Sequence, residues 1–360
     1  MVEKVDVRST GERMRMMRML FTAGLRHRGA GVVESMKGAA TVVLSSLHVD
    51  GLARLFGNPV FDRHVVRRRE SDPLFAVRHR HYLVRGLTMA ERVRCAVSHF
   101  EFEHAHCDCG YHAAVHGADG LTLWRAHVGD TRYAIVLQDS GSLRHEGPLS
   151  VVLKADERIL HVTSFAWVPT RMVDPHLHDG AATPMTMFVA RNQSQRASAP
   201  PMVRFRADFP QNTPAYFCLA ATLAIAQAHG YAQVVAVHHE RQVAYEAQLA
   251  AGFRRSYCDF WSTFGGECAG NGAYRMPAPI RMPPLDDVPA KHRARARARR
   301  TFWAEIGQST LDQLAPHLGG AARAVSRRST PEPSGLSSLM RTPLVVLLPE
   351  WLEQVPLYML

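Results

Sequence analysis

Two apolar runs that follow each other directly in the middle of the chain constrain its fold more than any other feature. Pro214 suits a first helical position, Ala215–His229 is apolar almost all round, and Gly230 suits the position just after a helix. A helix without a polar face is a buried helix. The next run, Ala232–Val237, reads as a strand without alternation, which is typical of a sheet covered on both faces. The pair predicts a layered domain in which a buried helix lies against a sheet.

β-rich runs precede this pair, and helical runs follow it. Turn residues at 139–142 and 154–157 separate the β-rich runs, so an antiparallel meander is expected. Helices are expected at Tyr245–Phe253 and Lys291–Phe302. We therefore predict an α/β (α+β) fold with a mixed, mostly antiparallel sheet and covering helices. The expected strands are Thr122–Trp124, Tyr133–Leu137, Leu149–Leu153, Ile159–Phe165 and Met185–Ala190.

The first third of the chain reads as mainly helical. Arg13–Phe21 has an apolar, Met-rich stripe that would either pack into the core or rest on a membrane surface. Thr88 and Glu91 have the spacing of a capping box and predict a helix start. We expect a helical region over 1–118, a sheet domain over 119–305, and a C-terminal helix, linker and tail over 306–360.

Composition and charge narrow the class of protein. The 360 residues are 46% hydrophobic and 21% charged, which excludes wholesale disorder. No apolar run is long enough for a transmembrane helix, and no signal peptide is recognised. Six cysteines are too sparse for a disulfide scaffold, which favours a reducing cytoplasm. We expect a cytoplasmic protein, either free or peripheral to the inner membrane.

An excess of positive charge favours an anionic partner. Lys and Arg number 43 against 32 Asp and Glu, a net charge of +11. The arginine run Arg293–Arg300 is the strongest local cluster, but alternate spacing spreads its side chains around a helix. The run is either a solvated helix or a contact for phosphate or anionic lipid. No nucleic-acid-binding motif accompanies it, so sequence-specific nucleic-acid binding is not expected.

Several segments together resemble the VirK/YbjX family, a bacterial family without an established molecular activity. The most specific segment is Ser256–Trp261 with Phe264–Gly266 and Gly272–Pro277; Leu87–His99 and Asp286–Arg293 extend the resemblance. The resemblance covers roughly residues 75–305. It implies a role in the Gram-negative envelope, linked to virulence-factor display and tolerance of antimicrobial peptides, and it supplies no catalytic residue. Family members tend to have a glycine-rich turn after the strand at Met185–Ala190, where this chain has residues 191–196, RNQSQR.

The order strand, strand, helix, strand also resembles the core of GNAT acyltransferases. In those enzymes the N-terminal amides of the helix bind the pyrophosphate of acyl-CoA. The corresponding region here is Arg191–Ala215, although the usual glycine-containing turn is missing. A transferase of this kind would use acyl-CoA or aminoacyl-tRNA as its donor, and an acyltransferase-shaped core without that chemistry is the alternative. The candidate ligand-binding arginines are Arg191, Arg196, Arg204 and Arg206.

Polar residues at the end of the buried strand are the candidates for catalysis. His239 and Glu240 follow Val237 directly, and ligands of α/β sheets gather at the carboxyl ends of strands. Strand ends also carry polar residues simply because they meet water. Further along the chain, Tyr257 and Asp259 join the catalytic candidates, and the same cleft would be lined by Trp261, Gly265 and Gly266. The alternative is that the aromatic residues anchor this segment in the core.

The densest group of metal-ligating residue types lies near the end of the helical region. Imidazole and thiolate groups are ligands that Zn²⁺ prefers, but the spacing is not that of a standard zinc module. A solvated junction between helix and strand therefore remains the alternative, and no metal is predicted. The residues concerned are His104, His106, Cys107, Cys109 and His112, with His116 one turn further on.

Two functions follow from these observations. The first is an envelope and virulence accessory protein that acts through a basic surface. The second is an acyl- or aminoacyl-transferase that uses His239, Glu240, Tyr257 or Asp259. A cleft at the end of Ala232–Val237 holding these side chains would favour the enzyme. The sequence leaves the substrate and the oligomeric state open.

Overall fold

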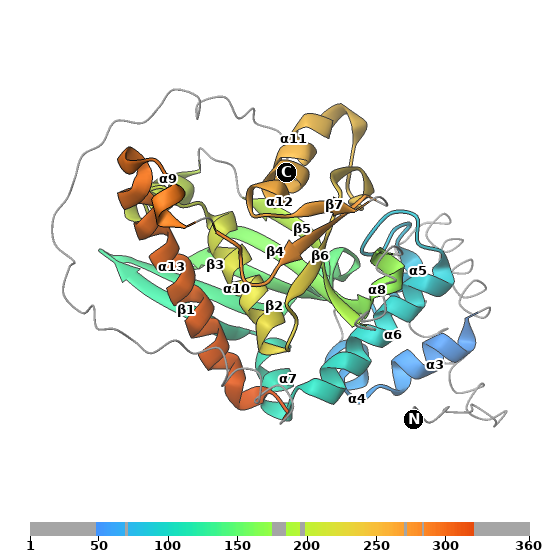
Figure 1. Cartoon of the computed structure of the whole chain (residues 1–360). Helices are drawn as coiled ribbons and strands as arrows, with labels where there is room; N and C mark the ends of the chain where they lie inside the picture. Colours follow the sequence, from blue (N-terminus) through green and yellow to red (C-terminus); the bar gives the residue numbers. More distant parts are fainter. Residues whose placement is uncertain are drawn as a thin grey trace.

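A computed structural model describes residues 48–68, 71–174, 185–194, 199–269, 272–282 and 284–319. A single mixed sheet runs through the centre of this part of the chain, with helices against it (Figure 1). The predicted α/β class with a mostly antiparallel sheet is confirmed. The predicted helix at Arg13–Phe21 and the predicted tail beyond residue 325 lie outside the described residues.

The sheet has eight strands in the order β1-β2-β3-β4-β5-β6-β8-β7. All neighbouring strands pair antiparallel except β5 and β6, which pair parallel. The predicted meander is confirmed as β1 to β5. The strands are β1 (Leu121–Val128), β2 (Thr131–Asp139), β3 (Leu149–Ala155), β4 (Arg158–Pro169), β5 (Met185–Ser194), β6 (Gln233–Val237), β7 (Glu267–Ala269) and β8 (Ala273–Pro277).

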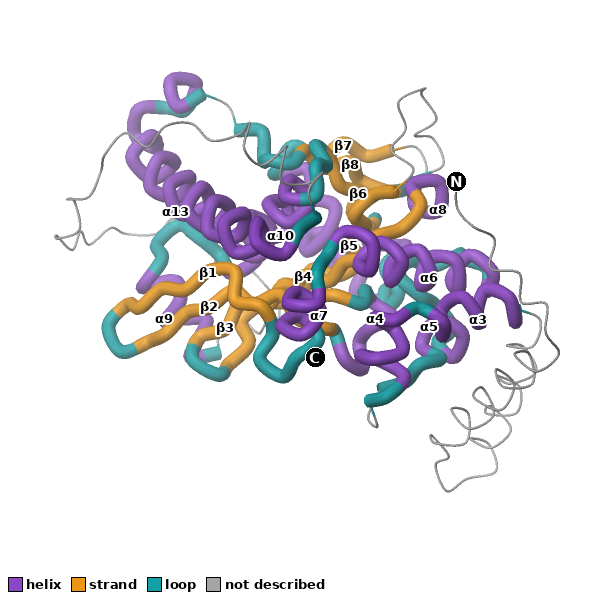
Figure 2. Tube along the Cα trace, turned by 90° about the horizontal axis from the view of Figure 1, so that it is seen from below, coloured by secondary structure: helices purple, strands orange, loops and turns teal. Residues whose placement is uncertain are grey.

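Two long helices form a layer on the sheet. α10 packs on β3, β4 and β5, and α13 packs on α10 and on β1. Both helices lie on the same side of the strands in Figure 2. The α-helices are α3 (Val49–Gly57), α4 (Pro59–Phe61), α5 (Phe75–Arg78), α6 (Met89–His106), α7 (Cys109–Val115), α8 (Thr170–Val173), α9 (Pro200–Asp208), α10 (Pro214–Ala228), α11 (Ala250–Arg254), α12 (Phe260–Thr263) and α13 (Ala290–Leu314). Short 3₁₀ and π segments are η1 (Asp62–Val66), η2 (Gly141–Glu146), η3 (His239–Arg241), η4 (Ala247–Leu249), η5 (Arg255–Asp259), η6 (Leu285–Asp287) and η7 (Ala315–His317).

The buried helix and the buried strand are where the sequence places them. Thr213 caps α10 by accepting a hydrogen bond from the Tyr216 amide, and Pro214 is at the start of the helix. Gly230 follows the helix with φ of 83°, a conformation that glycine adopts without strain. In β6, Val234 to Val237 are all buried, between β5 and β8. The helix α10 and the strand β6 in the central layer therefore follow from sequence signals within each segment.

The capping box at the start of α6 is also confirmed. The Glu91 amide donates to Thr88 Oγ1 at 3.3 Å, and the Thr88 amide donates to Glu91 Oε2 at 2.8 Å. Thr88→Ala removes one half of this box, so we expect the free energy of unfolding to fall by about 1 kcal/mol in urea titrations. Thr301→Ala is the control, because this exposed side chain lies inside α13 and caps no helix end. An equal loss in both variants would contradict the capping role.

A buried ionic network joins α6 to the sheet. Glu103 Oε2 lies 3.1 Å from His99 Nε2 and 3.5 Å from His116 Nε2, and all three side chains are fully buried. His116 Nδ1 then meets Asp139 Oδ2 at 3.1 Å, and Arg144 pairs with Asp139 at 2.7 Å. Burial alone would raise the pKa of Glu103 and lower that of His116. Their attraction outweighs burial, so the pKa of Glu103 is lowered and that of His116 is raised to about 9.

The structure corrects one predicted helix. Tyr245–Phe253 is not a continuous helix, because only η4 and then α11 form in this range. The Arg85 guanidinium donates to the carbonyls of Val243 and Tyr245, so these carbonyls serve a long-range contact instead of a helical one. At the other end of the sheet domain, α13 extends well beyond Phe302, and the predicted boundary at residue 305 falls inside this helix. Across the described ranges, no helix combines the length and apolarity needed to cross a bilayer.

Candidate functional site

The carboxyl ends of β5 and β6 form the edge at which the candidate site lies. The two strands are in register only at Phe188↔Val235 and Val189↔Ala236. A bulge at Ala190 of β5, opposite Ser164 and Phe165 of β4, follows at this level, and β5 then continues beside β4 to Ser194, whereas β6 ends at Val237. Parallel strands that separate in this way leave polar groups at one edge, where α/β sheets commonly bind ligands.

A chain of three polar side chains lies at the end of β5. Ser194 Oγ is 2.7 Å from His161 Nδ1, and His161 Nε2 is 2.8 Å from Asn192 Oδ1. Ser194 and Asn192 alternate on β5, so both face His161 on the neighbouring strand β4. His161 is 1% exposed, whereas Ser194 is exposed to solvent. The arrangement is a hydroxyl, an imidazole and an amide in line.

The hydrogen bonds determine which of these side-chain groups donate and which accept. Asn192 Nδ2 donates to the Ser256 carbonyl at 2.8 Å, so Asn192 Oδ1 faces His161 and can only accept. His161 therefore carries its proton on Nε2, with Thr163 Oγ1 as a second neighbour at 3.2 Å. Nδ1 is left with a lone pair, and the Ser194 hydroxyl donates to it. Burial lowers the pKa of His161 to about 3, so the ring is neutral at neutral pH.

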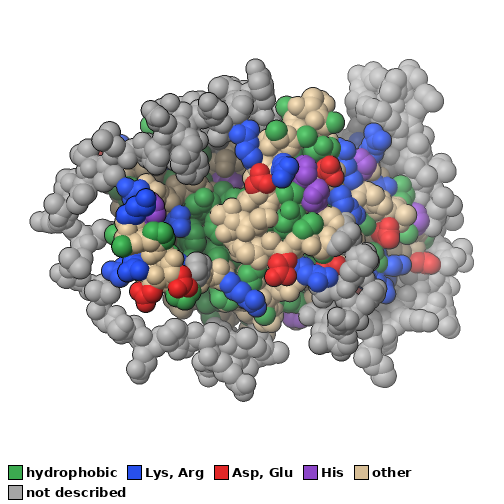
Figure 3. Space-filling model, turned by 45° about the horizontal axis from the view of Figure 1, so that its top comes forward, with side chains coloured by type: hydrophobic (Ala, Val, Ile, Leu, Met, Phe, Trp, Pro, Cys, Tyr) green, Lys and Arg blue, Asp and Glu red, His purple; other side chains and the backbone are tan. Residues whose placement is uncertain are grey.

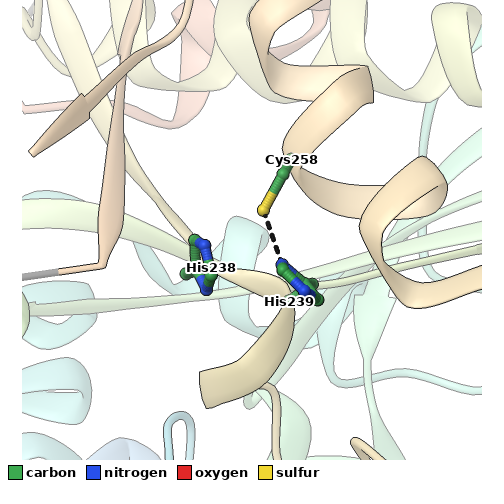
Figure 4. Close-up of side chains that lie close together, drawn as sticks. All are labelled: His238, His239 and Cys258. Atoms are coloured by element: carbon green, nitrogen blue, oxygen red, sulfur yellow. Dashed lines mark hydrogen bonds between the residues drawn. The ribbon is translucent and has the colours of Figure 1, made fainter. Parts of the chain in front are cut away.

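A second cluster lies at the end of β6 and joins two imidazoles to a thiol. His239 Nδ1 is 2.9 Å from Cys258 Sγ, and ligand atoms of His238, His239 and Cys258 all lie within 4.8 Å of one another. Figure 4 shows Cys258 reaching from its helical segment toward the two histidines, which follow the strand. Cys258 is 5% exposed, and the Tyr274 hydroxyl is hydrogen-bonded to it.

Burial sets the protonation of this cluster. It raises the pKa of the Cys258 thiol, although hydrogen bonds from the His239 backbone and from Tyr274 act in the opposite direction. Burial also lowers the pKa of His238, and the neighbouring His239 adds to the effect. The thiol is therefore protonated at neutral pH, and the His238 ring is neutral. Neutral imidazoles are the form that binds a metal ion.

The predicted catalytic residues do not all meet at this edge. His239 belongs to the thiol cluster, and the Tyr257 hydroxyl accepts from the Asn192 amide at 3.4 Å. Glu240 is 63% exposed beside His238, and Asp259 is 51% exposed and pairs with Arg254. Both carboxylates are therefore solvent-exposed, and Glu240 lies at the margin of the second cluster, 3.9 Å from His238 Nδ1.

The residues predicted to line the site are mostly packing residues. Trp261 is fully buried, and its Nε1 donates to the Val237 carbonyl at 2.9 Å. Gly265 makes a turn with φ of 79°, and a Cβ on Gly266 would come within 2.7 Å of the Trp261 carbonyl. Tyr257 stacks with Phe253 in the core. The aromatic residues and glycines thus hold the segment that carries Cys258.

The predicted arginine ligands do not converge. Arg191 lies 3.6 Å from Glu146 Oε2 and donates to Gln193, and Arg204 pairs with Asp208 on α9. Arg206 is exposed on the same helix, and Arg196 lies outside the described residues. In the view of Figure 3, Lys and Arg side chains form separate groups with Asp and Glu among them.

Two of the candidate metal ligands around Cys107 bond to backbone carbonyls. His106 Nδ1 bonds to the Phe102 carbonyl, and His112 Nε2 bonds to the Glu103 carbonyl. His104 and Cys109 are exposed, and Cys107 is half-buried. Within the described ranges, the group that brings three potential ligands together is His238, His239 and Cys258.

The sequence interpretation missed Ser194, His161, Asn192 and Cys258 as site residues. Cys258 could have been found, because it lies within the most specific segment and is followed by a buried tryptophan. The other three come together only through the pairing of β4 with β5. No local spacing in the sequence indicates that pairing register.

The fold and the site define a class of mixed α/β protein. Hydroxyl, imidazole and thiol groups lie at the carboxyl ends of β5 and β6, which are the one parallel pair among the described strands. A family model described as "Protein of unknown function (DUF535)" matches residues 55–177 and 213–311. The chain belongs to this family, DUF535, which is the VirK/YbjX family. Searches of curated proteins and of solved structures found no match.

Proposed function

We propose that the protein transfers acyl groups through Ser194, which His161 activates as a base. The observation that carries this proposal is the directed chain from Ser194 Oγ to His161 Nδ1 and from His161 Nε2 to Asn192 Oδ1, at 2.7 and 2.8 Å. A nucleophile, a base and a group that orients the base are the parts that acyl transfer needs. Asn192 is the positioning residue, held by Ser256 and Tyr257.

The reaction has two halves. In the first, Ser194 Oγ attacks the acyl carbonyl carbon, the bond between this carbon and the carrier's sulfur or oxygen breaks, and the serine proton passes through His161 Nδ1 to the leaving carrier. In the second, an acceptor amine or hydroxyl attacks the seryl ester, and Ser194 recovers a proton from the acceptor through His161. No oxidant or reductant is required.

The order of elements supports an acyltransferase. One parallel strand pair in an otherwise antiparallel sheet is connected through a buried helix, as the resemblance to the GNAT core implies. The pyrophosphate position expected at the start of α10 is not supported, because Thr213 caps that end and Trp303 packs against Tyr216. We therefore propose an activated acyl group on a phosphate-bearing carrier, either acyl-CoA or aminoacyl-tRNA, whose anionic part is bound elsewhere.

We propose that this activity serves the Gram-negative envelope. The VirK/YbjX resemblance supports a cytoplasmic accessory protein, free or peripheral to the inner membrane, that serves envelope integrity, virulence and tolerance of antimicrobial peptides. The net charge of +11 suits an anionic carrier or an anionic lipid surface. We assign no catalytic step to Glu240 or Asp259, which are exposed.

Acyl-enzyme formation tests the proposal. The full chain is incubated with acyl-CoAs, with aminoacyl-tRNA and with anionic lipid vesicles, and peptides are examined by mass spectrometry. We expect an acyl adduct on Ser194 with one of the two carriers, formed at least about 100-fold more slowly in His161→Gln and absent in Ser194→Ala. Ser142→Ala, an exposed serine in η2, is the matched control and should behave like the wild type.

The pH profile separates a base from a structural histidine. Because burial keeps His161 unprotonated, adduct formation should keep its rate from about pH 8 to about pH 5, with no loss near the ordinary histidine pKa. Thermal stabilisation by lipid alone, with no adduct on Ser194, would overturn the transferase and leave the accessory role. An equal adduct rate in wild type and a folded His161→Gln would exclude the proposed base.

A further inference from the structure

The thiol cluster at the end of β6 has the composition of a transition-metal site. His238 and His239 leave the strand in succession, and Cys258 approaches from η5, so three donor atoms converge from two elements (Figure 4). The three donors lie within 4.8 Å of one another, and the shortest separation, His239 Nδ1 to Cys258 Sγ, is 2.9 Å. A tetrahedral zinc ion holds its nitrogen and sulfur ligands at about 2.0–2.3 Å, so small side-chain rotations suffice.

The surroundings of the cluster fit a bound ion. Trp261 fixes the helical segment that carries Cys258 to the Val237 carbonyl, immediately before the two histidines. The Tyr274 hydroxyl is hydrogen-bonded to Cys258, and His238 Nδ1 accepts a hydrogen bond from the Glu240 amide at 3.3 Å, which orients the ring. His238 is 20% exposed, which provides a path for the ion to enter.

The donor set also selects the class of metal. One thiolate and two imidazoles suit Zn²⁺ and Co²⁺, whereas Mg²⁺ and Ca²⁺ require oxygen ligands. We propose that His238, His239 and Cys258 bind a zinc ion with three protein ligands and a fourth position open to a water molecule or to Tyr274. On binding, the Cys258 thiol loses its proton to solvent and forms the metal–sulfur bond. This site is independent of the proposed acyl transfer, because neither Ser194 nor His161 belongs to it.

Cobalt spectroscopy tests the proposal directly. The full chain is treated with a chelator, dialysed and titrated with Co²⁺, which gives a thiolate charge-transfer band and the visible bands of a tetrahedral ion. We expect one equivalent to bind and Zn²⁺ to displace it. The charge-transfer band should disappear in Cys258→Ser and persist in the control Cys109→Ser, which alters an exposed cysteine outside the cluster. No cobalt–thiolate band, or a band that persists in Cys258→Ser, would overturn the site.

Two further measurements test the site even if Cys258→Ser does not fold. His238→Ala alters a partly exposed side chain, and we expect it to weaken Co²⁺ binding at least about tenfold while the far-ultraviolet circular dichroism is unchanged. In the wild-type chain, Zn²⁺ should slow the alkylation of Cys258 by iodoacetamide. Alkylation of Cys258 at the same rate with and without Zn²⁺ would contradict metal binding and indicate a free thiol beside an imidazole.

Discussion

Glu103→Gln is expected to lower the free energy of unfolding by about 3–5 kcal/mol, the usual cost of breaking a buried ion pair from one side. The Glu103 carboxylate is fully buried and lies between His99 and His116 at 3.1 and 3.5 Å. Without its negative charge, the His116 imidazolium has Asp139 as its remaining carboxylate neighbour, and Asp139 is shared with Arg144. The change therefore leaves an undercompensated charge in the core.

Urea unfolding measures this loss, and Glu101→Gln is the matched control. Glu101 lies on the same helix and pairs with Arg54, but both side chains are more than 40% exposed. An exposed pair of this kind contributes at most about 1 kcal/mol. An equally small effect of Glu103→Gln would contradict the account of the buried network.

The pH dependence identifies the charge as the cause. The pKa of His116 in the folded protein is raised to about 9, so its stabilisation is complete below about pH 6.5 and is lost as the pH rises toward 9. The pKa of Glu103 is lowered, so its contribution is complete above about pH 4.5 and is lost as the pH falls. The difference between wild type and Glu103→Gln should therefore be largest near pH 6 and smaller at pH 9. A difference independent of pH would indicate a packing defect instead.

Trp261→Ala is expected to lower the free energy of unfolding by about 3–5 kcal/mol, since it removes a large, fully buried side chain. It also leaves the Val237 carbonyl without the indole donor at 2.9 Å. Trp261→Phe separates the two effects, because it keeps most of the ring volume and loses only the donor, for which we expect about 1–2 kcal/mol. Phe260→Ala, a neighbouring and partly exposed aromatic, should cost less than Trp261→Ala.

Urea titrations of the three variants measure these losses. Trp261→Ala should lower the free energy of unfolding most, and Phe260→Ala and Trp261→Phe should lower it less. A Trp261→Ala chain as stable as Phe260→Ala would contradict the view that the indole ties α12 to the end of β6.

The predictions that succeeded rest on local chemistry. The capping box of Thr88 and Glu91 needs only a spacing of three residues, and the start of α10 needs only Pro214. The residues of α10 are apolar on nearly all sides, and those of β6 do not alternate between apolar and polar. Both patterns indicate directly that the element is buried. These signals were enough to predict the class of fold and the central layer.

The predictions that failed depended on contacts between distant residues. The helix at Tyr245–Phe253 is interrupted where Arg85, far away in the sequence, donates to the Tyr245 carbonyl and to the Val243 carbonyl just before it. The chain from Ser194 to His161 depends on a strand register with a bulge, which no spacing along one strand reveals.

The position of α13 has a consequence for synthesis. This helix, the last α-helix described, covers α10 through Phe302 and Trp303, and its Ser309 Oγ donates to the Leu123 carbonyl on the first strand. Every described strand of the sheet leaves the ribosome before α13 does, so the nascent chain exposes the apolar surface beneath α13 until this helix is synthesised. A chain that ends before α13 would leave this surface exposed, and exposed apolar surface favours aggregation.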